Sequence, residues 1–140
     1  MKNSILFSVL MLVSASSALA KGDCRLKLIP TYNVGEFADV NTAQTAYEIT
    51  ETLSDRRHGF RISNDVDAPY TLQYTITANV SDQRNVQTAY SVQFNKAGST
   101  YQISASGSNN GTARKEKKQA KLYHQTVSAL ISALPACPER

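Results

Sequence analysis

One stretch of the sequence, YTLQYTITANVS from Tyr70 to Ser81, alternates between two kinds of side chain. Every second position from Tyr70 carries an aromatic or aliphatic residue, and the positions between them carry Thr, Gln, Asn or Ser. A period of two places successive side chains on opposite faces of a β-strand. The stretch therefore predicts a long strand with one face in a hydrophobic core and one face made of uncharged polar groups.

Two later segments, Val86–Phe94 and about Ser99–Ser108, show the same alternation. The connections SDQRN and NKAGS between the three segments are short, which favours an antiparallel meander. The uncharged polar face continues through all three predicted strands. The segment Asn109–Gly111 is expected to end the last of them.

The segment before the meander predicts a β-α-β unit. Arg25–Ile29 is a short strand that Pro30 is expected to end, because proline donates no ladder hydrogen bond. A loop follows, and a helix begins after Asn41, which forms a capping-box pattern with Gln44. Its predicted apolar stripe consists of Ala43, Ala46, Tyr47, Ile49, Thr50 and Leu53. Gly59 is the expected stop, and Phe60–Ile62 is a second short strand.

A final helix is expected to run to about Leu134, with Pro135 beyond its end. Its predicted stripe consists of Ala120, Tyr123, Val127, Leu130, Ile131 and Leu134. The element order β-α-β-β-β-β-α predicts an α+β fold, a two-layer sandwich whose mixed, mostly antiparallel sheet carries both helices on one face. The first two strands are expected to be parallel and joined by a right-handed crossover. The order of the strands in the sheet stays open.

The first twenty residues have the features of a secretory signal peptide. Lys2 precedes an apolar run from Ile5 to Val13, and the segment closes on small residues at Ala18–Ala20. The run is shorter than the roughly 20 residues of a membrane-spanning helix. We therefore expect cleavage after Ala20, a single exported domain over residues 21–140 and a periplasmic location without a membrane span.

The sequence contains two cysteines, Cys24 and Cys137, at opposite ends of the predicted mature chain. In an oxidising compartment this placement favours a disulfide, with two separate buried thiols as the alternative. Lys21–Asp23 does not resemble the lipobox that would precede a lipidated Cys24. The sequence has no Cys-x-x-Cys motif, which argues against a redox enzyme.

Residues that carry chemistry are few. His58 and His124 are the two histidines, and neither falls in a metal-binding spacing. Asp65 and Asp67 lack the remaining ligands of a calcium loop, so turn formation explains them better. No nucleophile motif is present. The sequence predicts no enzymatic activity, cofactor, metal or nucleic-acid partner.

Two surfaces are candidates for binding a partner. The second half of the chain, residues 83–140, carries 8 basic and 2 acidic residues, whereas residues 21–82 carry 6 and 9. The basic candidates are Arg114, Lys115, Lys117, Lys118 and Lys121. They fit an acidic protein or an anionic envelope surface, and a solvated helix face is the alternative.

The second candidate is the uncharged sheet face, represented by Thr71, Gln73, Thr75 and Thr77. Exposed strands commonly carry Lys or Glu, which also discourage edge pairing. A surface of short hydroxyl and amide side chains suits contact with a protein, a glycan or another copy of the chain. An ordinary wetted face is the alternative.

The element order, with the segment DAPYTLQYTITANV and a long closing helix, resembles a group of small envelope domains of Gram-negative bacteria. The group includes the periplasmic domain of the curli secretion channel, the lipoprotein activators of penicillin-binding proteins and the TolB amino-terminal domain. Their Ala-Asp-Tyr segment corresponds to Ala68, Pro69 and Tyr70, where Pro69 replaces the acidic residue. The resemblance implies a module that docks to other proteins, and it carries over no catalytic residue to this sequence.

The sequence therefore predicts a soluble periplasmic protein-interaction module, an accessory, assembly or regulatory factor of a cell-envelope complex. The alternative is an inhibitor or immunity protein that binds a hydrolase or toxin. Another envelope protein is the expected partner, and a homo-oligomer is also compatible with the sequence.

Overall fold

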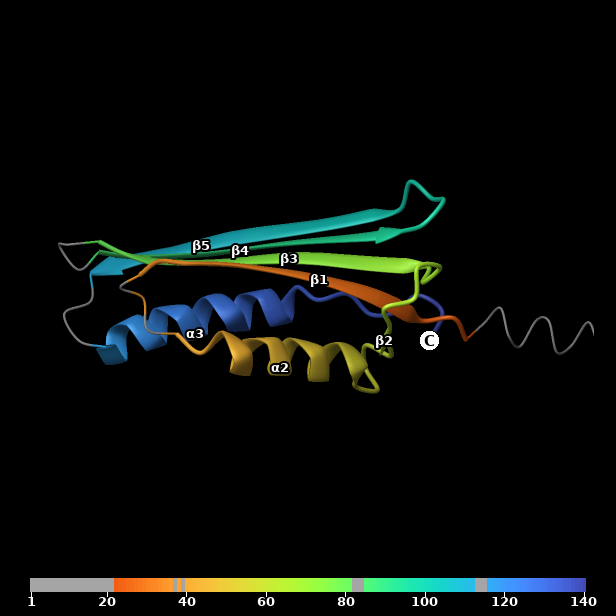
Figure 1. Ribbon diagram of the computed structural model, residues 1–140, viewed down its shortest axis with the longest axis horizontal. Helices are drawn as coiled ribbons and strands as arrows, with labels where there is room; N and C mark the ends of the chain where they lie inside the picture. The colour runs from red at the N-terminus through yellow and green to blue at the C-terminus, as the bar shows by residue number, and fades with distance from the viewer. Residues whose placement is uncertain (1–21, 37, 39, 82–84, 113–115) are drawn as a thin grey trace, which may run out of the picture.

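The computed structural model describes residues 22–36, 38, 40–81, 85–112 and 116–140. The predicted signal peptide, residues 1–20, lies outside them. A five-stranded sheet forms one layer and two helices form the other, both on the same face of the sheet (Figure 1). The elements are β1 Arg25–Val34, α2 Thr42–Ser54, β2 Arg61–Ile62, β3 Tyr70–Val80, β4 Asn85–Lys96, β5 Gln102–Thr112 and α3 Glu116–Ser132. The predicted α+β class and element order are confirmed.

The strands follow the order β2-β1-β3-β4-β5 across the sheet. β3, β4 and β5 form the predicted antiparallel meander. β1 lies between β2 and β3 and runs parallel to both. The parallel β1–β2 pair was predicted, whereas the insertion of β1 beside β3 was not.

The prediction that Pro30 ends the first strand is wrong. β1 continues from Pro30 to Val34, and that part pairs with β3 from Tyr74 to Ala78. In the sheet β2 pairs only with Arg25 and Leu26, so among the described residues the rest of β1 has a partner strand on one side alone. An edge strand uses alternate N–H groups, and proline is tolerated where the N–H would point outward.

The predicted end of β5 at Asn109–Gly111 is also wrong, since the strand runs to Thr112. Its glycines fit beside larger neighbours. A Cβ atom at Gly107 would lie 2.6 Å from Tyr90, and one at Gly111 would lie 3.1 Å from Leu122 of α3. A loop-like composition therefore serves as a strand because small residues make room for Tyr90 and α3.

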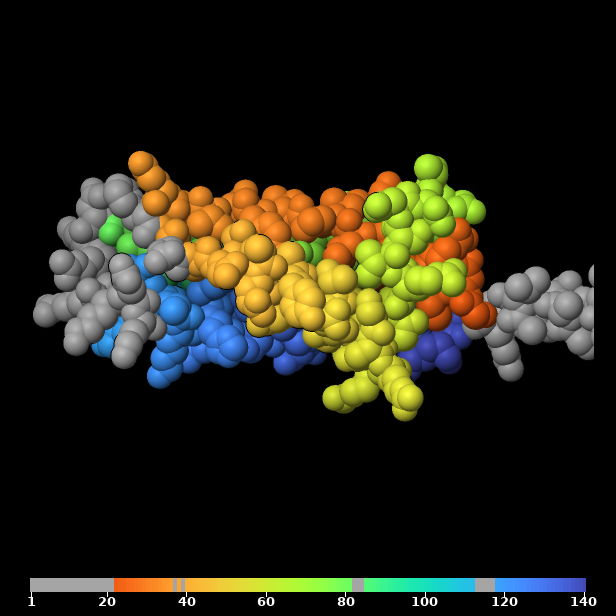
Figure 2. Space-filling view, turned by 60° about the horizontal axis from the view of Figure 1, so that its bottom comes forward, coloured from red at the N-terminus to blue at the C-terminus, as the bar shows by residue number. Residues whose placement is uncertain are grey.

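The helices cover the apolar face of the sheet, with α2 between β1 and α3 in the view of Figure 2. The predicted cap is confirmed, since Asn41 accepts a hydrogen bond from the Gln44 N–H at 3.0 Å. The predicted stripes are partly wrong. α2 buries Thr45, Ile49 and Leu53 and exposes Tyr47, and α3 exposes Ala120. Tyr123, Val127, Leu130 and Leu134 are buried as predicted.

Hydroxyl pairs join α3 to α2 within the helix layer and to β4 of the sheet. Thr45 donates to the Asn41 carbonyl at 3.1 Å, so its oxygen is free to accept from the Tyr123 hydroxyl at 2.7 Å. Thr88 donates to the Asn109 carbonyl and meets Thr126 at 2.6 Å in the same way. The Tyr123 and Thr126 hydroxyls of α3 thus have hydrogen-bond partners inside the core. This avoids the free-energy cost of an unpaired buried polar group.

The predicted disulfide joins Cys24, just before β1, to Cys137, beyond α3. Both residues are buried, at 7% and 0% exposure, and their Cα atoms lie 5.9 Å apart. Cys137 also donates its N–H to the His58 carbonyl at 2.7 Å. The end of the chain is therefore fastened to the start of β1 and to the turn that follows α2.

Candidate functional site

The face of the sheet opposite the helices is covered by none of the described elements (Figure 1). In β3, the predicted residues Thr71, Gln73, Thr75 and Thr77 lie on this open face. The paired positions of β4 and β5 continue it: Asn95, Gln93, Ser91, Ala89 and Gln87 in β4, and Gln102, Ser104, Ser106, Ser108 and Asn110 in β5. We call this set of side chains the open face. Its meander strands carry no charged residue there.

A hollow of about 480 Å³ lies in the middle of the open face. It contains two of the predicted residues, Gln73 and Thr75. Its lining is completed by Ser91, Val92, Gln93, Ser104, Ala105 and Ser106. The cross-strand pairs Gln73–Gln93, Thr75–Ser91 and Ser91–Ser106 explain this grouping. The register therefore gathers hydroxyl and amide groups around one shallow depression.

The chemistry of the open face is that of neutral hydrogen bonding. Hydroxyls and amides both donate and accept, so they can match a partner's backbone or side chains in many arrangements. Thr71, Thr75 and Thr77 are partly buried. Short side chains that are already restricted lose little conformational entropy on contact. At the β1 side of the face, Ile29 adds an apolar group that is 36% exposed.

The described basic candidates do not lie on the open face. Arg114 and Lys115 lie outside the described residues, and Lys117 is placed only as part of the α3 backbone. Lys118 and Lys121 are exposed on α3, on the helix layer and away from the open face. The structure therefore does not join the two predicted binding surfaces into one, and a role for the basic residues stays a prediction.

The covered side has its own groove, between the first halves of α2 and α3. It encloses about 330 Å³. Its lining consists of Val40, Asn41, Gln44, Thr45, Glu48, Ala120, Tyr123, His124 and Val127. His124, which falls in no metal-binding spacing, is exposed at this groove. The Tyr123 hydroxyl there is already bonded to Thr45, and burial raises its pKa.

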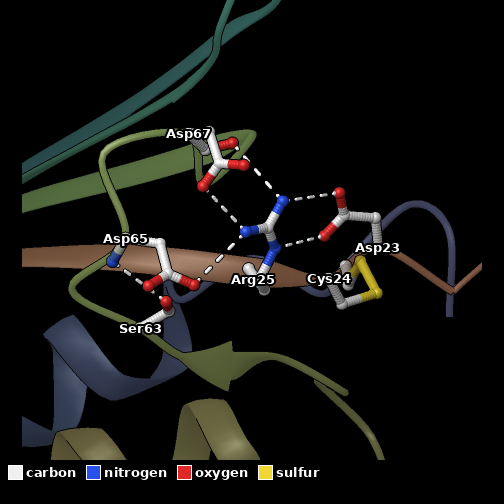
Figure 3. Close-up of polar contacts among 7 residues, drawn as sticks. Asp23, Cys24, Arg25, Ser63, Asp65 and Asp67 are labelled. Carbon is white, nitrogen blue, oxygen red and sulfur yellow. Dashed lines mark hydrogen bonds and ion pairs between the residues drawn. A yellow bond between two sulfur atoms is a disulfide. The ribbon is translucent and has the colours of Figure 1, made fainter.

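A cluster that the sequence did not predict surrounds Arg25 at the start of β1 (Figure 3). Its guanidinium contacts Asp23 through Nε at 2.9 Å, Asp67 through Nη1 at 2.9 Å and Asp65 through Nη1 at 3.3 Å. The Arg25 hydrogen bonds lower the pKa of Asp23. Hydrogen bonds from Ser63 and then Arg25 lower the pKa of Asp65.

The cluster has a structural reading. Asp65 and Asp67 form the predicted turn, in which the Ala68 N–H donates to the Asp65 carbonyl. Their carboxylates also fasten this turn to β1, next to the disulfide in Figure 3. One guanidinium thus holds the connection that leads into β3. Among the described residues, no group of three or more His, Cys, Asp or Glu has the arrangement of a metal site.

His58 follows α2 and contacts Asp55. The His58 ring Nδ1 lies 2.8 Å from Asp55 Oδ1, and the same carboxylate oxygen accepts the His58 N–H at 2.9 Å. These bonds lower the pKa of Asp55. Since the His58 carbonyl accepts from Cys137, the residue links the turn after α2 to the disulfide.

Neither described helix combines the length and the apolar character that crossing a membrane requires. No protein-family model matches the chain, and no curated protein matches its sequence. Solved structures do match. PelC from Paraburkholderia phytofirmans, a dodecamer in its own crystal, is 16% identical with a TM-score of 0.50, over 83% of this chain and 91% of that one.

Two other solved structures are similar at lower TM-scores. A minor lipoprotein from Acinetobacter baumannii is 20% identical, with a TM-score of 0.44, over 79% of this chain and 87% of that one. The hypothetical protein CT253 from Chlamydia trachomatis is 10% identical, with a TM-score of 0.43, over 78% and 96%. The curli, activator and TolB domains are not among these three. The resemblance is therefore confirmed only as a class, small bacterial α+β proteins.

Proposed function

We propose that the protein is an exported, periplasmic protein-interaction module, an accessory, assembly or regulatory factor of a cell-envelope complex. The observation that carries the proposal is the open face. It is an uncharged surface across β3, β4 and β5, hollowed at its centre and left uncovered by both helices. Its partner is another envelope protein with a matching neutral polar surface.

The composition of the open face supports docking over simple wetting. A protein with 15 basic and 11 acidic residues in 140 has many charges available for its surface. The meander strands nevertheless place none on this face. Burying neutral hydroxyls and amides costs far less free energy than burying ions. A partner can therefore exclude water from the open face without burying an unpaired charge.

The position of the ionisable groups supports a role without catalysis. The side chains that line the hollow include serine, threonine and glutamine but no histidine, carboxylate or cysteine. Asp23, Asp65 and Asp67 bind Arg25, and His58 contacts Asp55. These groups fasten connections at one end of the sheet. Among the described residues that line the hollow, no base lies beside a serine to make it a nucleophile.

The disulfide and the amino-terminal segment support export. A buried Cys24–Cys137 bridge is stable in an oxidising compartment such as the periplasm. The basic, apolar and small-residue regions of residues 1–20 match a cleavable signal. A cleavable signal and a disulfide are both features expected of a protein exported across the inner membrane.

The test is capture of partners from a periplasmic extract by the tagged mature protein. The variant Thr71→Lys with Thr75→Lys adds two charges beside the hollow. The control, Tyr47→Lys with Ser54→Lys, adds the same charge at exposed positions of α2. We expect the first variant to lose the captured protein and the control to retain it. Equal capture by wild type and both variants would remove the open face as the docking surface.

The identity of the captured protein decides between the two functional classes. A component of an envelope complex, lost with the Thr71→Lys and Thr75→Lys changes, supports the accessory role. A hydrolase or toxin captured through the same face would instead support the inhibitor or immunity role.

A further inference from the structure

A second surface, the free backbone edge of β5, borders the open face, to which the side chains of the even-numbered β5 residues belong. We propose that this edge pairs with β5 of a second copy of the chain. The two strands run antiparallel about a two-fold axis at Gly107 and join the two sheets into one. The proposal uses the backbone of β5 and the flank of α3, so it stands independently of the proposed function.

The two edges of the sheet differ in their protection. Natural proteins guard edges with charges, prolines, bulges or very short strands. On one side the sheet ends in the two-residue β2, and the exposed length of β1 beyond it contains Pro30. β5 is 11 residues long and contains no charged residue and no proline. Among the described residues, none pairs with its outer side.

The direction of the free backbone groups follows from two hydrogen bonds. Ser81 donates to the Asn85 carbonyl at 2.9 Å, which makes the odd-numbered residues of β4 bond toward β3. Lys96 donates to the Tyr101 carbonyl at 3.4 Å, so the even-numbered residues of β4 bond toward β5. Their partners in β5 have odd numbers. The outward N–H and C=O groups therefore belong to Gln102, Ser104, Ser106, Ser108, Asn110 and Thr112.

These outward groups set the register of a symmetric pair. Centring two antiparallel strands on Gly107 places Ser106 opposite Ser108 of the second copy, and it places Ser104 opposite Asn110. Each pair joins two outward-facing residues, as an antiparallel ladder requires. This register also uses all 11 residues of β5. On the helix side the axis falls between two glycines, where no side chain obstructs the approach.

The helix layer fits the same arrangement. α3 packs against both β4 and β5. We place α3 midway between β4 and β5, which are about 4.8 Å apart. The two-fold axis lies half a strand spacing beyond β5, so the distance from α3 to the two-fold axis is about one strand spacing. The two copies of α3 would then lie roughly 9.6 Å apart, within the range of about 8–10 Å for packed helices. The two sheets can therefore join without a clash between their helices.

At the level of the axis, the flank of α3 is small and uncharged. Leu122 packs beside Gly111, and Gln125 accepts a hydrogen bond from the Asn109 amide at 2.8 Å. Extending these contacts along β5 places Gly107 about level with Ser128 and Ala129. Both are exposed although little of either side chain projects. Small residues at the crossing point permit close approach of two helices.

The ends of the paired helices are electrostatically complementary. In the antiparallel arrangement the exposed Lys121 of one copy lies just past the carboxyl end of α3 in the other, and the exposed Lys118 lies about one turn farther. That end carries partial negative charge from its free carbonyls, and its last turn contains no basic residue of its own. The second copy therefore supplies cations that the helix lacks, which favours a copy of this chain over an unrelated strand.

The test is the mass of the mature protein in solution, by light scattering and sedimentation over a range of concentrations. We expect wild type to form a dimer in a concentration-dependent equilibrium. Ser106→Pro removes an outward N–H and leaves the hydrogen bonds to β4. We therefore expect this variant to be folded by circular dichroism and monomeric by mass. A wild-type protein that stays monomeric, or one that forms a dodecamer as PelC does, overturns the proposal.

A charge exchange tests the register. Ser106→Lys with Ser108→Lys places like charges opposite each other across the axis, and we expect the dimer Kd to rise by at least about tenfold. Ser106→Lys with Ser108→Glu places opposite charges there and should restore the dimer. Failure to restore it overturns the register at Gly107. Thr71→Lys with Thr75→Lys should leave the dimer unchanged, which separates this result from the open-face test.

Discussion

The two faces of the sheet are built from alternate residues of the same strands. They differ in the side chains they carry and in the elements that cover them. Leu72 is fully buried beneath the helices, whereas its neighbour Gln73 is exposed at the hollow. The covered face combines aromatic and aliphatic packing with satisfied hydroxyl pairs. The open face has neutral polar groups, and none of the described elements covers it. The difference indicates that stability resides on one face and that the other face can change without loss of the fold.

The largest effect is expected from the disulfide that closes the covered side. Replacing Cys24 and Cys137 together by Ala should lower the free energy of unfolding by about 4–5 kcal/mol, because the bridge closes a separation of 113 residues. Urea unfolding of the oxidised wild type and the variant measures it. A loss below about 1 kcal/mol would show that the α3 contacts hold the chain end without the bridge.

The next effect compares two neighbours on β3. Leu72→Ala should cost about 2–5 kcal/mol because it opens a cavity in the core. Gln73→Ala should stay within about 0.5 kcal/mol, as exposed substitutions usually do. Thermal unfolding of both variants measures the difference. Equal destabilisation would contradict the division of roles between the faces.

A smaller effect separates two hydroxyls of the covered face. Thr88→Val should leave the Thr126 hydroxyl buried without its partner and cost about 1–3 kcal/mol. Thr126→Val should cost about 1 kcal/mol or less, because Thr88 keeps its bond to the Asn109 carbonyl. Denaturant unfolding of the two variants under the same conditions gives the order. The reverse order would show that the hydroxyl network has a different direction.

The smallest effect on stability concerns the cluster at Arg25 and depends on pH. The folded-state pKa values of Asp23 and Asp65 are lowered, so their contribution is complete above the ordinary value of 3.8. It is lost as the pH falls below that value. Arg25→Gln should therefore lower the Tm near neutral pH, and the gap from wild type should close below about pH 4. Arg56→Gln, at an exposed position, is the control and should show no such gap.

The sequence predicted the layers because a period of two is distinct along β3 and β4. It failed at β5 and at the part of β1 that β2 does not cover, where the usual signals are weakest. Pro30 is acceptable at an edge. The Gly-rich end of β5 leaves room for Tyr90 of β4 and Leu122 of α3. Both features depend on tertiary neighbours.

The candidate site was predicted in part. Thr71, Gln73, Thr75 and Thr77 share the open face, but the hollow depends on a register that the sequence did not fix. The Arg25 cluster was missed because its partners lie 40 and 42 residues away. A signal did exist: Arg25 begins β1 and Asp67 precedes β3. Two parallel strands place such residues at the same end of the sheet.

The most direct test of the open face is site-specific photo-crosslinking in the periplasm. A photoreactive residue at Gln73 lies in the hollow, and one at Tyr47 is exposed on α2. We predict a discrete crosslinked partner from position 73 and none of the same mass from position 47. Crosslinks from position 47 alone would contradict the account and place the docking surface on the helices.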